Sequence, residues 1–236
     1  MSSRSPLRSL VRYVAAGAGM AAGAYATHVA RTWIRYGQVP LPTAEEADPL
    51  LDRLMPAYDI VERHHTYVGA PAAVTFAAAC DMNLLDRPLV RAIVRARELI
   101  LRAAPDVRAR PKGLLAEMQS MGWVILAEHP GREVVVGAVT RPWEANVTFR
   151  SVPPDEFAPF DEPDYVKIAW TLRADEIGVA DSVFRTETRA VATDAAARGK
   201  FRRYWSFVSP GIVLIRWASL GPLKREAERR AEPLGR

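Results

Sequence analysis

Residues 165–174 read YVKIAWTLRA, and residues 181–193 read DSVFRTETRAVAT. Side chains of a β-strand point alternately to its two faces, and both segments alternate apolar with polar residues in that way. Thr193 or Asp194 then predicts the start of a long helix, because both residue types cap helices. Two strands followed by a terminal helix predict an antiparallel sheet packed against that helix.

The terminal helix is expected to bury one face. Aromatic and branched residues recur there at steps of three and four, which is the period of a helix face; they are Phe201, Tyr204, Trp205, Val208, Ile212 and Ile215. Pro210 has no N–H and clashes with the preceding turn, so we predict a kink or a restart at Ser209–Pro210. Trp205 is expected to be largely buried, close to Trp170 or Phe184.

The segments before residue 165 alternate between strand and helix patterns. They predict a strand at 58–68, helices at 72–85 and 87–103 with Asp86 as a cap, a hairpin at 122–140 and a strand at 145–152. We expect residues 106–113 to form a polar connection and residues 151–164 an acidic, proline-rich loop. This order of elements is an α+β plan.

Five segments carry a resemblance to a known group of proteins. They read GWVILAEHPGREVVVGAVT (122–140), PWEANVTF (142–149), PDYVKIAWTLRA (163–174), DSVFRTETR (181–189) and KFRRYWSFVSPGI (200–212). In their strand and helix patterns, and in their order along the chain, they resemble bacterial members of the START-like superfamily, also called SRPBCC, over roughly residues 58–232. The resemblance implies a helix-grip fold, in which a curved sheet wraps a C-terminal helix and encloses an apolar cavity. It also implies lipids, polyketides or other hydrophobic molecules as ligands; some members are cyclases and many only bind.

The candidate ligand-binding residues are mostly aromatic, since ligand pockets are apolar with few polar groups. They are Trp123, Trp143, Phe149, Trp170 and Phe184 on the sheet, Tyr204 and Trp205 on the helix, and Arg185 and Glu187 as a polar anchor. The charged ladder Arg185, Glu187 and Arg189 shares one strand face. The favoured interpretation places that face outside and solvated; in the alternative, Arg185 and Glu187 enter the cavity.

No motif for a metal, a cofactor or a nucleophile is visible, and we expect none of these. His64 and His65 are adjacent on a strand, so their side chains point to opposite faces and cannot share one ion. Cys80 lies in an alanine-rich helix and is expected to be a small core residue.

The positive charge of the chain is concentrated at the N-terminus. The net charge is +5, and residues 1–40 contain five arginines and no acidic residue, so the remainder has a formal net charge of zero. Domains that bind nucleic acids normally carry a basic surplus, so we expect no nucleic-acid partner. A separate basic stripe on the helix at 87–103 is expected to face anionic headgroups, an acidic partner or only solvent; it comprises Arg87, Arg91, Arg95 and Arg102.

Residues 13–30 carry no formal charge and would span roughly 27 Å as a helix, close to the hydrocarbon thickness of a bilayer. Trp33 and Tyr36 follow where interfacial aromatic residues are expected. We predict a single-pass membrane anchor. Two alternatives remain: a cleaved signal peptide ending at Ala24-Tyr25-Ala26, which gives a secreted domain, and an alanine-rich helix packed on a cytoplasmic domain.

The predicted organisation is a basic N-terminus with the anchor (1–37), a proline-rich linker (38–57) and a helix-grip ligand-binding domain (58–232). The expected function is noncatalytic binding of a hydrophobic small molecule or lipid at a membrane. One alternative is a polyketide-cyclase-like enzyme using Glu187, Arg185, Glu144 or His64 as acid or base. Another is a structural or partner-recruiting domain with a filled core.

Overall fold

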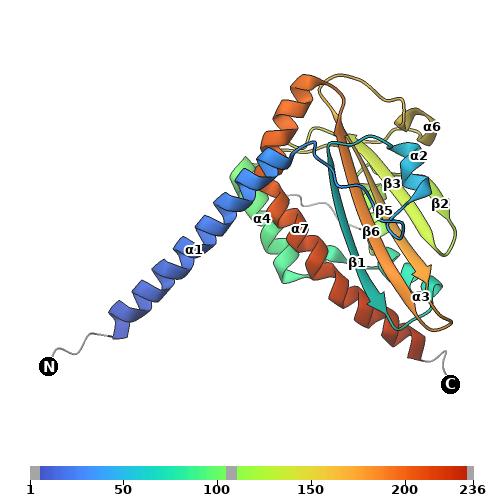
Figure 1. Cartoon of the computed structure of the whole chain (residues 1–236), viewed down its shortest axis with the longest axis horizontal. Helices are drawn as coiled ribbons and strands as arrows, with labels where there is room; N and C mark the ends of the chain where they lie inside the picture. The colour runs from blue at the N-terminus through green and yellow to red at the C-terminus, as the bar shows by residue number, and fades with distance from the viewer. Residues whose placement is uncertain (1–5, 105–110, 233–236) are drawn as a thin grey trace.

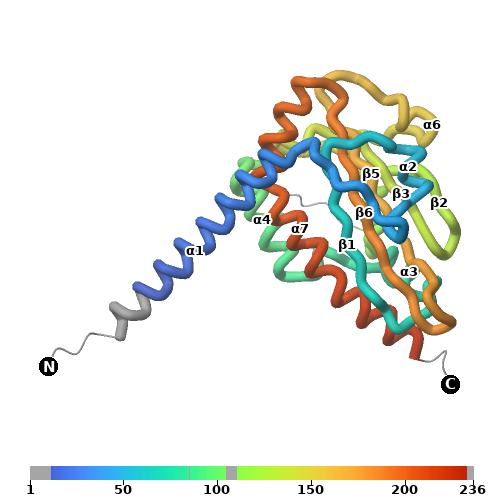
Figure 2. Tube along the Cα trace, viewed as in Figure 1, coloured from blue at the N-terminus to red at the C-terminus, as the bar shows by residue number. Residues whose placement is uncertain are grey.

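The computed structural model describes residues 6–104 and 111–232 as one antiparallel sheet with helices around it (Figures 1 and 2). The strands are β1 (Ile60–Val68), β2 (Val124–His129), β3 (Glu133–Thr140), β4 (Phe149–Arg150), β5 (Val166–Glu176) and β6 (Ser182–Ala192). The helices are α1 (Pro6–Arg35), α2 (Pro49–Leu54), α3 (Ala72–Cys80), η1 (Leu84–Asp86), α4 (Pro88–Leu101), α5 (Leu114–Ser120), α6 (Pro154–Phe157) and α7 (Ala195–Ala231). The strand order is β1-β6-β5-β3-β2, with β4 paired to β3. This is the expected α+β helix-grip architecture, a curved sheet with a long C-terminal helix.

Four short elements differ from the prediction. The strand expected at 145–152 is reduced to β4, and the helix expected at 72–85 ends at Cys80. Helix α6 lies in the segment expected to be a loop, and α5 lies in a segment for which no element was predicted; α5 buries Leu114 and Met118, which stand one helical turn apart. Residues 105–110, part of the expected connection, lie outside the described residues. The prediction that Asp86 caps helix α4 is wrong. Arg87 occupies the N-cap position, and its backbone is extended because Pro88 follows it.

Helix α7 begins as predicted and continues without a break through both of its prolines, Pro210 and Pro222. The Asp194 carboxylate accepts hydrogen bonds from the backbone N–H groups of Ala196 and Ala197, at 2.7 and 2.8 Å. The helix continues through Pro210 to Ala231, so the predicted restart is wrong. The helix is nevertheless bent, because α7 changes direction along its length (Figure 1), as expected of a helix that contains proline.

The sheet is covered on both faces at its strand β3. On β3, Val134 and Val136 belong to a cluster that includes residues of α3 and α7, whereas Val135 and Val139 pack with Leu51 of α2. Every residue of β3 is therefore buried. A strand that is covered on both sides needs apolar residues at consecutive positions, and this explains the sequence VVVGAV at residues 134–139.

The segment expected to be a linker, residues 38–57, packs on the outer face of the sheet. Leu51 is fully buried and Met55 is 2% exposed. The Asp48 carboxylate caps α2 by accepting from the Leu51 N–H at 2.8 Å, and it also accepts from the Thr171 hydroxyl at 3.0 Å. Arg173 donates to the Ala47 carbonyl at 2.8 Å. The proline-rich segment is thus a covering layer of the sheet and not a free spacer.

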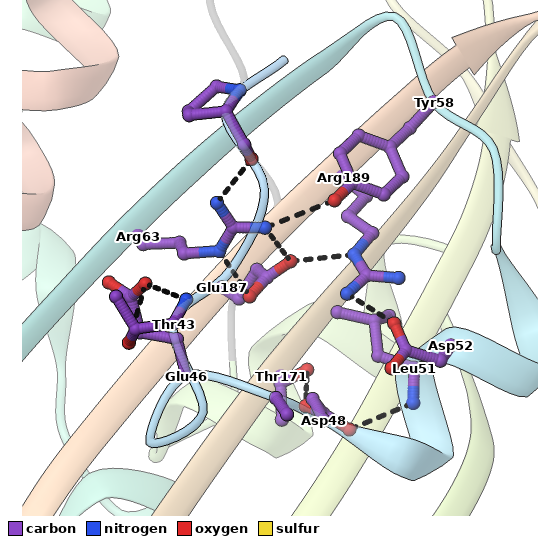
Figure 3. A network of polar contacts seen from close by, with 12 residues as sticks. Thr43, Glu46, Asp48, Leu51, Asp52, Tyr58, Arg63, Thr171, Glu187 and Arg189 are labelled. Carbon is purple, nitrogen blue, oxygen red and sulfur yellow. Dashed lines mark hydrogen bonds and ion pairs between the residues drawn. The ribbon is translucent and has the colours of Figure 1, made fainter.

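The charged ladder lies beneath this covering layer (Figure 3). Glu187 accepts from Arg63 Nε at 2.9 Å and from Arg189 Nε at 2.6 Å, and Arg189 also pairs with Asp52 of α2 at 2.7 Å. Arg189 is fully buried and Glu187 is 6% exposed. The prediction that the ladder lies on the outer face of the sheet is confirmed. The prediction that it is exposed to solvent is wrong, because Asp52 and the Tyr58 ring cover Arg189. The alternative, with Arg185 and Glu187 entering the cavity, is also wrong.

Glu133 on the same outer face makes the stability of the fold dependent on pH. Burial and the neighbouring Asp48 raise the pKa of Glu133 to about 8, against an ordinary value of 4.5. Between these two values the folded chain keeps a proton that the unfolded chain releases, so the free energy of unfolding is expected to fall as pH rises from about 4.5 to about 8.

We expect Glu133→Gln to remove this decline and to raise stability most at the alkaline end. The measurement is urea unfolding at a series of pH values, with Glu128→Gln on the exposed end of β2 as the matched control. If the Glu133→Gln variant keeps the same pH dependence as the unchanged chain, the assignment to Glu133 is wrong.

Helix α1 contacts the body of the molecule only through its C-terminal part, and its N-terminal part projects away (Figure 1). The Tyr25 hydroxyl donates to the Phe207 carbonyl at 2.8 Å, and Arg202 donates to the Trp33 carbonyl at 2.7 Å. Residues 12–27 are all exposed. The predicted anchor, residues 13–30, therefore lies in a helix that mostly lacks packing within the described chain.

Candidate functional site

A cavity of about 690 Å³ lies between the inner face of the sheet and helices α4, α5 and α7. Its size is within the range of small-molecule sites, roughly 300–1,000 Å³. Strands β5 and β6 contribute Trp170 and Thr188, and α7 contributes Trp205 and Ile215.

Five of the nine predicted ligand-binding residues line this cavity; they are Trp123, Phe149, Trp170, Tyr204 and Trp205. Phe184 faces inward but is 2% exposed within the packed core, and Trp143 lies under the Lys200 ammonium at 5.5 Å. Arg185 and Glu187 lie on the opposite face of the sheet, where Arg185 pairs with Asp175 at 3.1 Å.

Trp205 is buried as predicted, at 6% exposure. Its ring lies 6.0 Å from that of Phe201, and both side chains pack with Ile60 and Val166 of the sheet. Trp170 and Phe184 belong to a different core cluster from Trp205, so the expectation that Trp205 packs close to one of them is wrong. Trp170 also lines the cavity, and its indole N–H donates to the Thr186 hydroxyl at 2.6 Å.

A charged side chain that the sequence analysis missed also lines the cavity. Arg216 of α7 lies over the Trp170 ring at 3.5 Å and donates to the Thr188 hydroxyl at 3.0 Å. A sequence signal existed, since Arg216 is the only charged residue between Tyr204 and Leu223. Burial lowers the pKa of Arg216 to about 9, so the guanidinium remains charged at neutral pH.

Glu62 and His64 project from β1 toward the inner face. Their side chains approach to 3.7 Å, and His64 Nε2 is buried with no hydrogen-bond partner in the described part of the chain. Burial raises the pKa of Glu62 and lowers that of His64, which favours the neutral form of each. His65 is exposed, so the two adjacent histidines do point to opposite faces.

The other residues considered for chemistry lie outside the wall of the cavity. No group of three or more His, Cys, Asp or Glu side chains in the described residues could hold a metal ion. Cys80 packs against the core, and burial raises the pKa of its thiol to about 11. The acidic loop pairs with basic neighbours: Glu162 with Arg150 and Asp164 with Lys200, each at 2.6 Å. Glu144 pairs with Arg141 at 3.7 Å and is not among the cavity residues.

One described helix is long and apolar enough to cross a membrane by length and composition, and it is α7 rather than α1. The core helix of a soluble protein passes the same test, and α7 buries Phe201, Trp205 and Leu223 in the domain. The hydropathy of α7 is therefore weak evidence for a membrane span, and the predicted anchor in α1 gains no support from this criterion.

Comparisons with known proteins give no family for the chain. No family model matches it, and neither does any curated protein. Among solved structures, CalU16 from Micromonospora echinospora is 14% identical with a TM-score of 0.26, over 74% of this chain and 87% of that one. The Zhui aromatase/cyclase from Streptomyces sp. R1128 is 14% identical with a TM-score of 0.23, over 72% and 94%. The di-domain ARO/CYC BexL is 14% identical with a TM-score of 0.24, over 72% and 46%. Values this low assign neither a family nor an activity.

Proposed function

We propose that this protein is a START-like protein that binds a hydrophobic small molecule or lipid, without catalysis, in the cavity beneath α7. The observation that carries the proposal is the cavity itself, about 690 Å³ walled mainly by aromatic and aliphatic side chains. A domain with a filled core predicts no space of this size, so the structural alternative is disfavoured. The helix-grip architecture agrees with the proposed superfamily.

The direct test is native mass spectrometry of the extracted full-length protein. We expect a second species heavier by one lipid-sized molecule, which unfolding in organic solvent releases. A chain that carries nothing, and that also fails to bind a panel of hydrophobic fluorescent probes, would contradict the proposal.

An enzyme of the polyketide-cyclase kind is the second candidate, and the Glu62–His64 pair is the observation that favours it. Two neighbouring groups with shifted pKa values, one an acid and one a base, are what proton transfer requires. Of the four residues predicted for this role, only His64 points toward the inner face of the sheet. Recovery of the bound molecule with an altered mass after incubation, lost on His64→Phe, would favour the enzyme.

We also propose that the protein is held at a membrane by α1. An isolated helix rich in Ala and Gly is marginally stable in water, yet residues 12–27 are helical and unpacked. Helix α4 presents a second surface of suitable chemistry, because the four arginines of its stripe are exposed beside Leu89, Leu99 and Ile100. Basic and apolar side chains together suit the anionic surface of a bilayer.

The double substitution Val14→Glu and Met20→Glu is expected to release the protein from membranes. These side chains are 64% and 73% exposed, so the change leaves the packing of the domain intact. A charge near the centre of a span, where Met20 lies, costs roughly 3 kcal/mol, and Val14 near the end of the span adds a smaller cost. The measurement is sedimentation with membranes after a carbonate wash. Val179→Glu, at a loop position that is 99% exposed, is the control. Equal sedimentation of the double variant and the control would contradict anchoring by α1.

A further inference from the structure

Arg216 places a positive charge on the mainly apolar wall of the cavity. Its helix contributes Ile212 and Ile215 to the same wall, and the facing strands contribute Trp170 and Thr188. The guanidinium lies deep in the domain between α7 and the sheet. A buried charge is costly unless it is paired and hydrogen-bonded, so the partners of Arg216 decide what the site can do.

The protein satisfies Arg216 only in part. One nitrogen donates to the Thr188 hydroxyl at 3.0 Å, and the Trp170 ring supports the flat face of the guanidinium. No carboxylate of residues 6–104 or 111–232 forms an ion pair with it. Glu62 acts on it only from a longer distance. A guanidinium has five N–H donors. The part of the Arg216 side chain that other residues leave uncovered faces the cavity.

Glu62 is close enough to act on Arg216 but forms no ion pair with it in the described residues. Its carboxyl group is itself buried, and burial raises its pKa, which favours the uncharged form. Arg97, the other arginine of the cavity wall, donates to the Tyr204 hydroxyl and the Pro142 carbonyl, both at 3.4 Å. In the described part of the chain Arg216 thus makes one such hydrogen bond and Arg97 makes two, so Arg216 keeps more N–H donors without a partner.

We propose that the cavity binds an amphiphilic monocarboxylate whose head group pairs with Arg216. This rests on the proposed binding function and names the class of molecule bound. The planar fork of a guanidinium matches the two oxygens of a carboxylate, and one arginine balances one negative charge. The apolar body of the molecule lies along the wall formed by Trp123, Phe149 and Met118.

The test compares cis-parinaric acid, a fluorescent long-chain carboxylic acid, with its uncharged methyl ester on the purified full chain. Energy transfer from the cavity tryptophans to the probe reports binding inside the cavity. We expect the acid to bind about 10- to 100-fold more tightly than the ester, as a charged hydrogen-bonded pair would provide. In Arg216→Gln this preference is lost while ester binding persists. Arg216→Lys keeps part of it, and Arg203→Gln, an exposed position of the same helix, keeps all of it.

The outcomes separate this inference from the function on which it rests. Equal binding of acid and ester to the unchanged chain, or an acid preference that survives in Arg216→Gln, overturns the assignment of a carboxylate and leaves the binding function standing. Failure of both probes to bind the unchanged chain overturns both. Ester binding by Arg216→Gln shows that the variant is folded, so loss of acid binding there reports on the charge alone.

Discussion

Arg189→Ala is expected to lower the free energy of unfolding by about 3–5 kcal/mol, because it leaves a buried carboxylate without one of its two cations. Arg189 is fully buried and pairs with Glu187 at 2.6 Å and Asp52 at 2.7 Å. It also donates to the Met55 carbonyl at 2.9 Å, so it ties the covering layer to the sheet. We therefore expect faster proteolytic cleavage within residues 38–57 of the variant.

Arg132→Ala is the matched control for this prediction. Arg132 forms an ion pair with Asp175 at 3.1 Å, but its side chain is 61% exposed. Exposed pairs contribute about 0–1 kcal/mol, so the control is expected to unfold at nearly the urea concentration of the unchanged chain. A loss of less than about 1 kcal/mol in Arg189→Ala would contradict the view that this buried network holds the covering layer.

Trp205→Ala is expected to cost about 3 kcal/mol, the lower end of the range for truncating a large aromatic residue in a core. The ring packs against Phe201 and the sheet on one side, where truncation opens a void, but it borders the existing cavity on the other. The same change enlarges the cavity, so the affinity for hydrophobic probes should change as well. A purely structural core residue would alter stability alone.

Trp217→Ala on the same helix provides the control, since Trp217 is 71% exposed. Exposed substitutions usually change stability by less than about 0.5 kcal/mol. Urea unfolding and probe titration of the two variants measure both effects. A Trp205→Ala variant as stable as Trp217→Ala, with unchanged probe binding, would show that Trp205 belongs neither to the core nor to the cavity wall.

Most of the regular elements could be predicted because their signals are local. Strand alternation, the Asp194 cap and the spacing of aromatic residues on α7 depend only on neighbours along the chain. The short helices α5 and α6 could not, since a few residues carry too little periodicity to distinguish a turn of helix from a loop. Once the strands and α7 had been predicted, their aromatic residues could be assigned to the cavity. Arg216 was missed because it is one charge in an apolar run.

The phase of β6 shows where local information ends. Its sequence places Phe184, Thr186 and Thr188 on one face and the charged ladder on the other, and nothing local says which face α7 covers. Which face is covered by α7 is decided by the segments that pack on the two faces of β6. Helix α7 packs on the face of Thr188, and residues 48–55 cover the face of Arg189.

The sequence by itself determined the α+β plan, the order of the strands and helices along the chain, and the aromatic character of the space under the last helix. Only the tertiary structure decided that the proline-rich segment 38–57 covers the sheet and that the charged ladder is buried under it. The physical reason is that a buried ion pair needs partners distant along the chain. Arg189 meets Asp52, and Arg63 meets Glu187, only once the sheet has formed. The same holds for Arg216, whose place beside Trp170 and Thr188 depends on how α7 crosses the sheet.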